Sequence, residues 1–423
     1  MASFFPERLS GKMEKINKIT AKSYLWNTIG SILSAASSLF LLMCVTRVVG
    51  AAEGGIFSLA FATAQLVLTI GKFGVRSYQA TDIFHELSLS TYFVSRGITC
   101  ILMLMLGAGT VVLAGYSLYK GTVVLAVCVI KMVDAVEDVY HGQLQLVNRL
   151  YIAGKLLAAR NIFTMVIFAV TITMSKKLLF TCWITGISSL ALCIMLNHVY
   201  VNKYEKIKFC WNRTEQKALF FACFPLFSGS FLSLLIYNIP KYAIDIYCST
   251  EIQTYYAIIF MPAFMINMFS EFAFKPMLTS LAEWWKNGER QRFIAATVKL
   301  IANIFLVTIV ILGIMYLIGA DILSFVYGVD VTSYKMELML LLLGGGFSAA
   351  VYFLYNVLSA MRRQKAIFRN YSIGTVFIFF LAFYSVKTGG MSAAALSYVL
   401  AEIVLCSLML WSTFHTHKKD FKK

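Results

Sequence analysis

A stripe of ionisable side chains interrupts one of the most apolar parts of the sequence. Its members follow one another at intervals of three, three and one residues: Lys131, Asp134, Glu137 and Asp138. Successive residues of a helix turn by about 100°, so these side chains would share one helical face. Lys131 and Asp134 are spaced to pair directly. Such a face suits the binding of a charged group or a small ion, and the sequence offers no activated nucleophile that would indicate hydrolytic chemistry.

Lys131 would lie deep in a membrane. The apolar run begins at Gly121, so Lys131 lies ten residues inside it, about 15 Å at 1.5 Å per residue. That is near the middle of a hydrocarbon layer of about 30 Å, where a charge costs several kcal/mol unless it faces protein or water. The stripe is either a structural Lys131–Asp134 pair or the lining of a cavity that meets a substrate or a coupling ion. We favour the cavity, because one structural pair would not need the further ionisable groups beside it.

Other polar candidates lie near the ends of apolar runs: Arg47, Arg76, Arg160, Asn238 and Lys241. An arginine there can extend its side chain to the lipid headgroups, but Arg160 lies about two turns inside its run, which favours a specific role. Pro240, between Asn238 and Lys241, should kink or end its helix. That segment is either a helix break tolerated beside protein or water or an ordinary helix end with an interfacial lysine.

Composition places these residues in a membrane protein. The chain has 423 residues, of which 59% are hydrophobic and 13% charged, whereas soluble domains carry about 25% charged residues. The net charge of +17 suggests nucleic acid as a partner, but the basic residues lie in loops between apolar runs, as membrane insertion selects. Nine cysteines without a CxxC pair argue against a disulfide framework or a metal site.

The apolar runs are long enough for twelve membrane-spanning helices. We expect them at 23–47, 54–74, 97–117, 121–146, 153–174, 178–201, 218–239, 253–274, 293–318, 335–360, 369–386 and 391–414. Lysine and arginine then split into 29 on the side of both termini and seven on the other side. The more basic side of a membrane protein faces the cytoplasm, so both termini should be cytoplasmic.

This pattern predicts two six-helix bundles. The expected parts are a cytoplasmic amino-terminal segment 1–22, a first bundle 23–201, a cytoplasmic linker 202–217, a second bundle 218–414 and a cytoplasmic tail 415–423. Six-plus-six arrangements are common among secondary transporters. No phosphate-binding GxxxxGK[ST] motif is present, so we expect no ATP-driven step.

Three motifs stand out: Thr46-Arg47-Val-Val-Gly50 continuing to Gly74-Val-Arg76-Ser-Tyr78, Asp134-Ala-Val-Glu137-Asp138-Val-Tyr140-His141, and Asn238-Ile-Pro240-Lys241-Tyr242. Together they resemble those of Wzx-type polysaccharide and O-antigen flippases, which belong to the multidrug/oligosaccharidyl-lipid/polysaccharide exporter superfamily. The resemblance runs the length of the chain. It implies an all-α membrane protein with two six-helix bundles around a central cavity that opens alternately to either side.

The resemblance also implies a cargo and a location. The cargo would be an undecaprenyl-pyrophosphate-linked oligosaccharide, moved from the inner to the outer leaflet of the bacterial cytoplasmic membrane for surface polysaccharide assembly, with polymerase machinery as a further partner. A pyrophosphate needs cationic and hydrogen-bonding partners, for which the candidates are Lys131, Arg47, Arg76, Lys241, Asn238 and Arg160. No catalytic residue, cofactor or bound metal is expected. The carboxylates Asp134, Glu137 and Asp138 would instead bind a coupling Na⁺ or H⁺.

Two other functions remain open. A cation-coupled multidrug antiporter of the same superfamily would bind organic cations at its acids, but basic residues are as prominent here. A membrane-embedded glycosyltransferase or polymerase would be an enzyme, and such enzymes usually need a large loop outside the membrane, which the sequence lacks.

Overall fold

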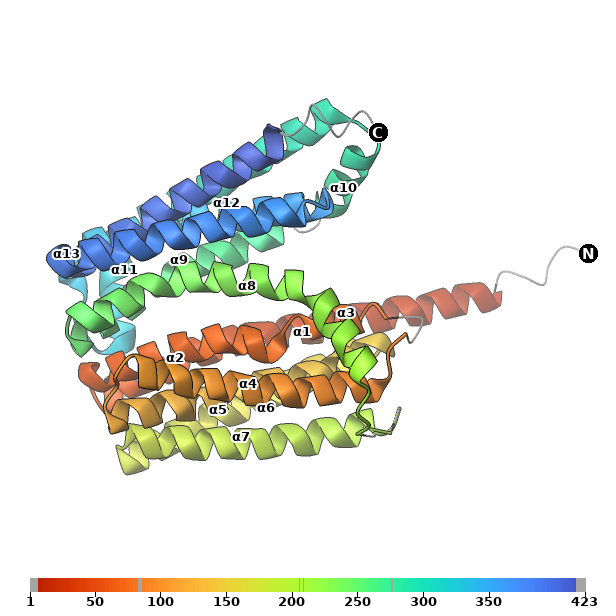
Figure 1. Ribbon diagram of the computed structural model, residues 1–423, viewed down its shortest axis with the longest axis horizontal. Coiled ribbons are helices and arrows are strands. Elements are labelled where there is room, and N and C mark those ends of the chain that lie inside the picture. Colours follow the sequence, from red (N-terminus) through yellow and green to blue (C-terminus); the bar gives the residue numbers. More distant parts are fainter. Residues whose placement is uncertain (1–6, 83–85, 205, 208, 275–276, 416–423) are drawn as a thin grey trace, which may run out of the picture. The chain divides into compact units, whose positions relative to one another are not determined.

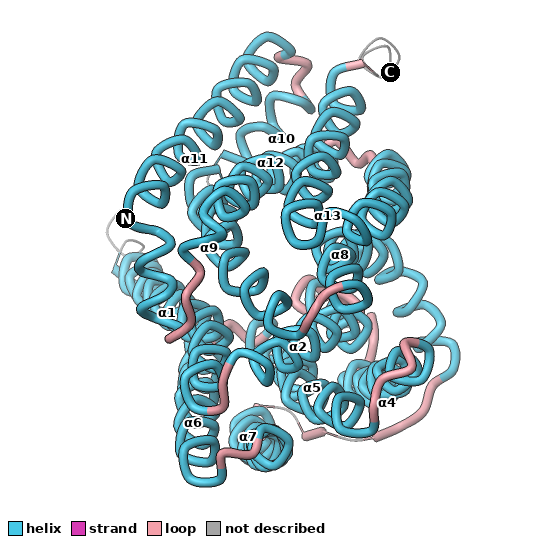
Figure 2. Tube along the Cα trace, turned by 90° about the vertical axis from the view of Figure 1, so that its left-hand side faces the viewer, coloured by secondary structure: helices cyan, strands magenta, loops and turns pink. Residues whose placement is uncertain are grey.

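The computed structural model describes residues 7–82, 86–204, 206–207, 209–274 and 277–415. These residues form helices and connecting loops, without strands (Figure 2). Within them, nine helices are long and apolar enough to cross a membrane. The chain is therefore a multi-pass membrane protein of the all-α class, as its composition predicted.

The chain forms two compact units. The first contains the chain up to Val48 and Thr63–Phe227, and the second contains Val49–Ala62 and the chain from Ser228 onward. Two long helices, α2 (Ala51–Lys72) and α8 (Arg213–Tyr247), therefore each contribute residues to both units. The division falls inside these helices, whereas the sequence placed it in the loop 202–217.

Local contacts explain why the first half of α2 belongs to the second unit. The hydroxyl of Thr254, in α9 (Thr250–Phe274), donates a hydrogen bond to the carbonyl oxygen of Ala51. A Cβ at Gly55 would lie 1.9 Å from the carbonyl oxygen of Thr250. Glycine thus allows the two helix backbones to approach closely, as small residues do in membrane helix pairs.

The first unit is built from five further long helices and one short one (Figure 1). They are α1 (Glu7–Val48), α3 (Val75–Gln79), α4 (Leu89–Leu113), α5 (Leu118–Leu146), α6 (Leu150–Ser175) and α7 (Leu178–Val201). A Cβ at Gly154 of α6 would lie 2.4 Å from the carbonyl carbon of Trp26 in α1. This close crossing fixes α6, which carries Arg160, against α1.

The second unit is built around α12. Its elements besides α9 are α10 (Leu278–Lys286), α11 (Arg290–Tyr327), η2 (Thr332–Tyr334), α12 (Lys335–Ala360) and α13 (Gln364–Phe414). Consecutive glycines of α12 pack against three different helices. A Cβ at Gly344 would lie 2.6 Å from Tyr398 of α13, one at Gly345 2.9 Å from Ala263 of α9, and one at Gly346 2.6 Å from Thr308 of α11. The glycine triplet therefore serves close helix packing.

Twelve long helical segments correspond to the twelve expected spans. The bounds of α7 and α12 are those predicted. Two expected spans, 369–386 and 391–414, join in α13 across a kink at Gly390, whose φ of 55° suits glycine. The short helices α3 and α10 and the turn η2 were not predicted, because hydropathy detects only apolar runs of spanning length.

The helix end expected near Pro240 is wrong. Helix α8 continues through Pro240 to Tyr247. Proline removes one backbone donor, and a helix packed among other helices tolerates that loss. Lys241 therefore lies within the helix rather than at its end.

Candidate functional site

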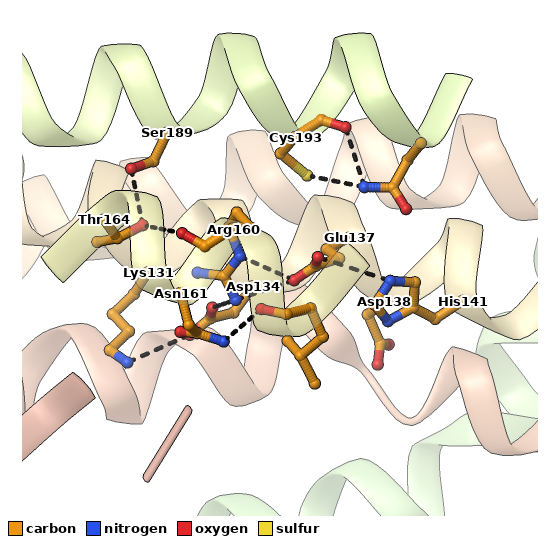
Figure 3. A network of polar contacts seen from close by, with 12 residues as sticks. Lys131, Asp134, Glu137, Asp138, His141, Arg160, Asn161, Thr164, Ser189 and Cys193 are labelled. Carbon is orange, nitrogen blue, oxygen red and sulfur yellow. Dashed lines mark hydrogen bonds and ion pairs between the residues drawn. The ribbon is translucent and has the colours of Figure 1, made fainter. Parts of the chain in front are cut away.

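An ion-pair network in the first unit joins α5 to its neighbours. We call it the α5 network, and it consists of Lys131, Asp134, Glu137, Asp138 and His141 of α5 with Arg76 of α3, Arg96 of α4 and Arg160 of α6. Figure 3 shows the part around Arg160. The predicted polar face of α5 thus exists, and it faces charged residues of other helices.

Arg160 links two of the three carboxylates. Its Nη2 lies 2.7 Å from Oδ1 of Asp134, and its Nε donates a hydrogen bond of 2.9 Å to Oε2 of Glu137. The Arg160 side chain is only 5% exposed, so it does not extend to the lipid headgroups. Lys131 Nζ also donates to Oδ2 of Asp134 at 3.2 Å, which confirms the expected pairing. Asp134 is therefore held by two cations from two helices.

Asp138 lies between two other arginines. Arg96 Nη2 lies 2.9 Å from Oδ2 of Asp138, and the same guanidinium donates to the carbonyl oxygen of Gly71 at the end of α2. Arg76 Nη1 lies 3.7 Å from Oδ1 of Asp138, and its Nη2 donates a 3.3 Å hydrogen bond to Gln145. The Arg96 side chain is 3% exposed and that of Arg76 is 31% exposed. Arg76 is thus the more loosely held and more accessible of the two.

The charges of the α5 network leave a positive excess. It contains four lysine or arginine side chains and three carboxylates, and each carboxylate has a guanidinium partner. His141 Nε2 lies 3.5 Å from Oε1 of Glu137. Breaking a buried ion pair by removing one partner costs about 3–5 kcal/mol, because the other charge stays buried. The network therefore holds α3, α4 and α6 against α5.

A hydrogen bond between neutral side chains links α7 to α6 beside this network. The hydroxyl of Thr164 donates to the carbonyl oxygen of Arg160 at 2.9 Å and lies 2.9 Å from the hydroxyl of Ser189 in α7 (Figure 3). Asn161 donates to the carbonyl oxygen of Leu157 at 2.9 Å. The two polar residues that interrupt the fifth apolar run, Arg160 and Asn161, are thus both buried and bonded within the protein.

The remaining predicted site residues lie elsewhere. Lys241 Nζ donates a 3.3 Å hydrogen bond to Asn238 and lies 5.0 Å from the centre of the Phe260 ring. Asn238 is buried and donates to the carbonyl oxygen of Ala62 at 3.5 Å. All these contacts lie within the second unit. Arg47 lies in the last turn of α1 and is exposed.

Sequence reasoning missed Arg96. The expected span began at residue 97, which placed Arg96 in a loop, whereas α4 begins at Leu89. The side chain of Ser88 accepts a hydrogen bond from the backbone N–H of Thr91 and caps the helix. A serine before an apolar run is a known helix start signal. Reading it would have placed Arg96 two turns inside the helix.

No family model matches the chain. The capsular polysaccharide biosynthesis protein CapF of Staphylococcus aureus is 21% identical over 412 residues, which cover 95% of this chain and 100% of the relative.

Solved structures share the fold at low identity. The lipid II flippase MurJ in an inward closed conformation has a TM-score of 0.70 at 16% identity, covering 91% of this chain and 87% of that one. A mutant of the Vibrio cholerae MATE transporter VcmN has a TM-score of 0.60 at 11% identity, covering 96% and 98%. A MOP superfamily transporter from Pyrococcus furiosus has a TM-score of 0.59 at 13% identity, covering 96% and 97%.

These likenesses confirm the predicted fold class. The chain has the twelve-helix architecture of transporters and flippases, and the neighbours named here are not enzymes. The resemblance noted in the sequence motifs agrees with both the relative and the folds. The roles of individual residues in cargo or ion binding stay predictions.

Proposed function

We propose that this protein is a flippase that moves an undecaprenyl-pyrophosphate-linked oligosaccharide from the inner to the outer leaflet of the bacterial cytoplasmic membrane. Two likenesses support a lipid-linked cargo: CapF takes part in capsular polysaccharide biosynthesis, and MurJ is a lipid II flippase. The more basic side of the chain, with both termini, would face the cytoplasm. A polymerase that lengthens the exported units would be a partner.

The observation that carries this proposal is the loosely held guanidinium of Arg76. It lies 3.7 Å from Asp138 and its side chain is 31% exposed, while Arg96 satisfies the same carboxylate at 2.9 Å. A pyrophosphate can therefore take Arg76 without leaving Asp138 unpaired. Charge-assisted bonds between arginine and phosphate are among the strongest polar contacts in proteins. Lys131 and Arg160 would strengthen the positive field around such an anion.

The same geometry weighs against a multidrug antiporter. Organic cations need carboxylates that are available to them, and each of Asp134, Glu137 and Asp138 already has a guanidinium partner. The assignment of these three acids to a coupling ion stays a prediction, and Na⁺ or H⁺ would have to compete with the arginines. The likeness to MATE transporters concerns the fold.

The proposal is tested by replacing Arg76 in cells. Without the protein, lipid-linked oligosaccharides should accumulate on the cytoplasmic side while their synthesis continues, which separates a flippase from a glycosyltransferase. Arg76→Gln should reverse this accumulation far less effectively than the wild type. Losing one charge-assisted hydrogen bond of about 1.5–3 kcal/mol lowers binding roughly tenfold or more.

The matched control is Arg292→Gln. Arg292 is 73% exposed and pairs with Glu289 on the same helix end, so its loss should leave export unchanged. Both variants must reach wild-type levels in the membrane. Full export by Arg76→Gln would contradict the proposal.

A further inference from the structure

Glu402 is a buried carboxyl group in the second unit that lacks a basic partner. It lies in α13, is 3% exposed, and its Oε2 has no hydrogen-bond partner within the part of the chain that the structure describes. No ion pair involves it among the same residues. The carboxylates of the α5 network are different, because each is bound by an arginine.

The titratable groups near Glu402 are phenols and a thiol. Tyr237 of α8, with Tyr371, Tyr398 and Cys406 of α13, lies within electrostatic reach of its charge. None of them supplies a positive charge. The other described neighbours therefore decide whether a cation balances Glu402.

The helices around Tyr237 and Tyr398 contribute neutral groups. The ring of Phe260 in α9 lies 4.8 Å from that of Tyr237 and 5.0 Å from that of Tyr398. Asn267 of α9 donates hydrogen bonds to the hydroxyls of Tyr237, at 3.3 Å, and Ser348 of α12, at 3.4 Å. Tyr237 and Tyr398 are thus in contact with an aromatic ring and with neutral polar groups.

Lys241 is the basic residue of α8 closest in sequence to Tyr237. It lies against the ring of Phe260, 5.0 Å from its centre, and donates to Asn238 at 3.3 Å. It forms no ion pair with Glu402. The described surroundings thus leave the charge of Glu402 uncompensated.

We propose that Glu402 is a proton-binding site, which takes up and releases H⁺ as the protein cycles between its transport states. A carboxylate without a partner is strongly disfavoured in an apolar interior, and one proton removes that charge. A hard metal ion would need several oxygen ligands, carboxylates among them, whereas the titratable neighbours of Glu402 are phenols and a thiol. The described residues also contain no group of three or more metal-binding side chains.

The position of Glu402 lets its charge act on helix packing. Tyr398, one turn earlier in α13, packs so closely on α12 that a Cβ at Gly344 would lie 2.6 Å from its ring. Both residues follow the kink at Gly390. A charged Glu402 requires water or a rearrangement of the contact between α12 and α13. Protonation of Glu402 would therefore favour the close packing of these two helices, and release of the proton would favour a looser packing. This role rests on the transport function proposed above.

The direct test is infrared difference spectroscopy of the purified full-length protein in lipid vesicles between acidic and alkaline buffer. We expect a carboxylic acid band that appears on acidification in the wild type and is lost in Glu402→Gln. Glu289→Gln is the control, because Glu289 pairs with Arg292 at 2.6 Å, and it should keep the band. Glu402→Asp keeps a titratable group and should show the band at a shifted position. This variant tests the proposal if Glu402→Gln does not fold.

The outcomes separate this proposal from the flippase proposal. A band that Glu402→Gln leaves unchanged would overturn the proton site even if the protein flips its lipid. A band that sodium chloride abolishes at constant ionic strength would indicate a sodium site and overturn it as well. A Glu402-dependent band in a protein that moves no lipid would support proton binding and count against the flippase.

Discussion

At the residue scale, Arg160 is the residue on which the α5 network depends most. It provides guanidinium contacts to both Asp134 and Glu137, at 2.7 and 2.9 Å. The sequence indicated that Arg160 had a specific role, since it lies too deep for headgroup contact. The sequence could not identify its partners, because pairing between α5 and α6 is a tertiary contact. The same limit applies to Asp138, whose partner Arg96 comes from α4.

We predict that Arg160→Met strongly destabilises the protein. Two buried carboxylates would lose their guanidinium, at a cost of about 3–5 kcal/mol. The double variant Arg160→Met with Glu137→Gln should recover part of this loss, because it leaves one fewer uncompensated charge. The measurement is thermal unfolding of the purified protein in detergent. If Arg160→Met unfolded at the wild-type temperature, these contacts would not stabilise the protein.

At the element scale, close helix crossings place the charged residues. Helix α6 crosses α1 at Gly154, where an added Cβ would lie 2.4 Å from the carbonyl carbon of Trp26. Hydropathy predicted the existence of these helices and, for α7 and α12, their bounds. It failed for α4, which starts eight residues before the expected span, and for α8, which passes through Pro240. Helices extend beyond their apolar stretch wherever polar residues are capped or packed, and an apolar window does not detect that.

We predict that Gly154→Ala lowers the unfolding temperature. The added methyl group would meet the backbone of α1, which cannot rotate away as a side chain can, and overpacking of this kind costs about 1–3 kcal/mol. Gly109→Ala in α4 is the matched control, because a Cβ there has nothing within 4 Å. Alanine is the better helix former by about 1 kcal/mol, so this variant should be at least as stable as the wild type. Equal unfolding temperatures for the two variants would show that the crossing of α1 and α6 is not tight.

At the scale of the whole molecule, the two units carry different buried charges. The first holds a paired network with a positive excess, and the second holds Glu402 without a described basic partner. Composition and charge distribution predicted the fold class, which the likeness to MurJ and MATE structures confirms. Glu402 was missed because one glutamate in an apolar run looks the same whether or not a base lies beside it.

The central claim, that the protein moves a lipid-linked anion, is tested most directly with purified protein in vesicles. An undecaprenyl-pyrophosphate-linked oligosaccharide with a labelled sugar is added to both leaflets, and a reagent that cannot cross the membrane attacks the label from outside. We predict that the wild type exposes the protected label, and that Arg76→Gln does so roughly tenfold more slowly. If the label in vesicles that contain the wild-type protein stayed as protected from the reagent as in protein-free vesicles, the result would contradict the account.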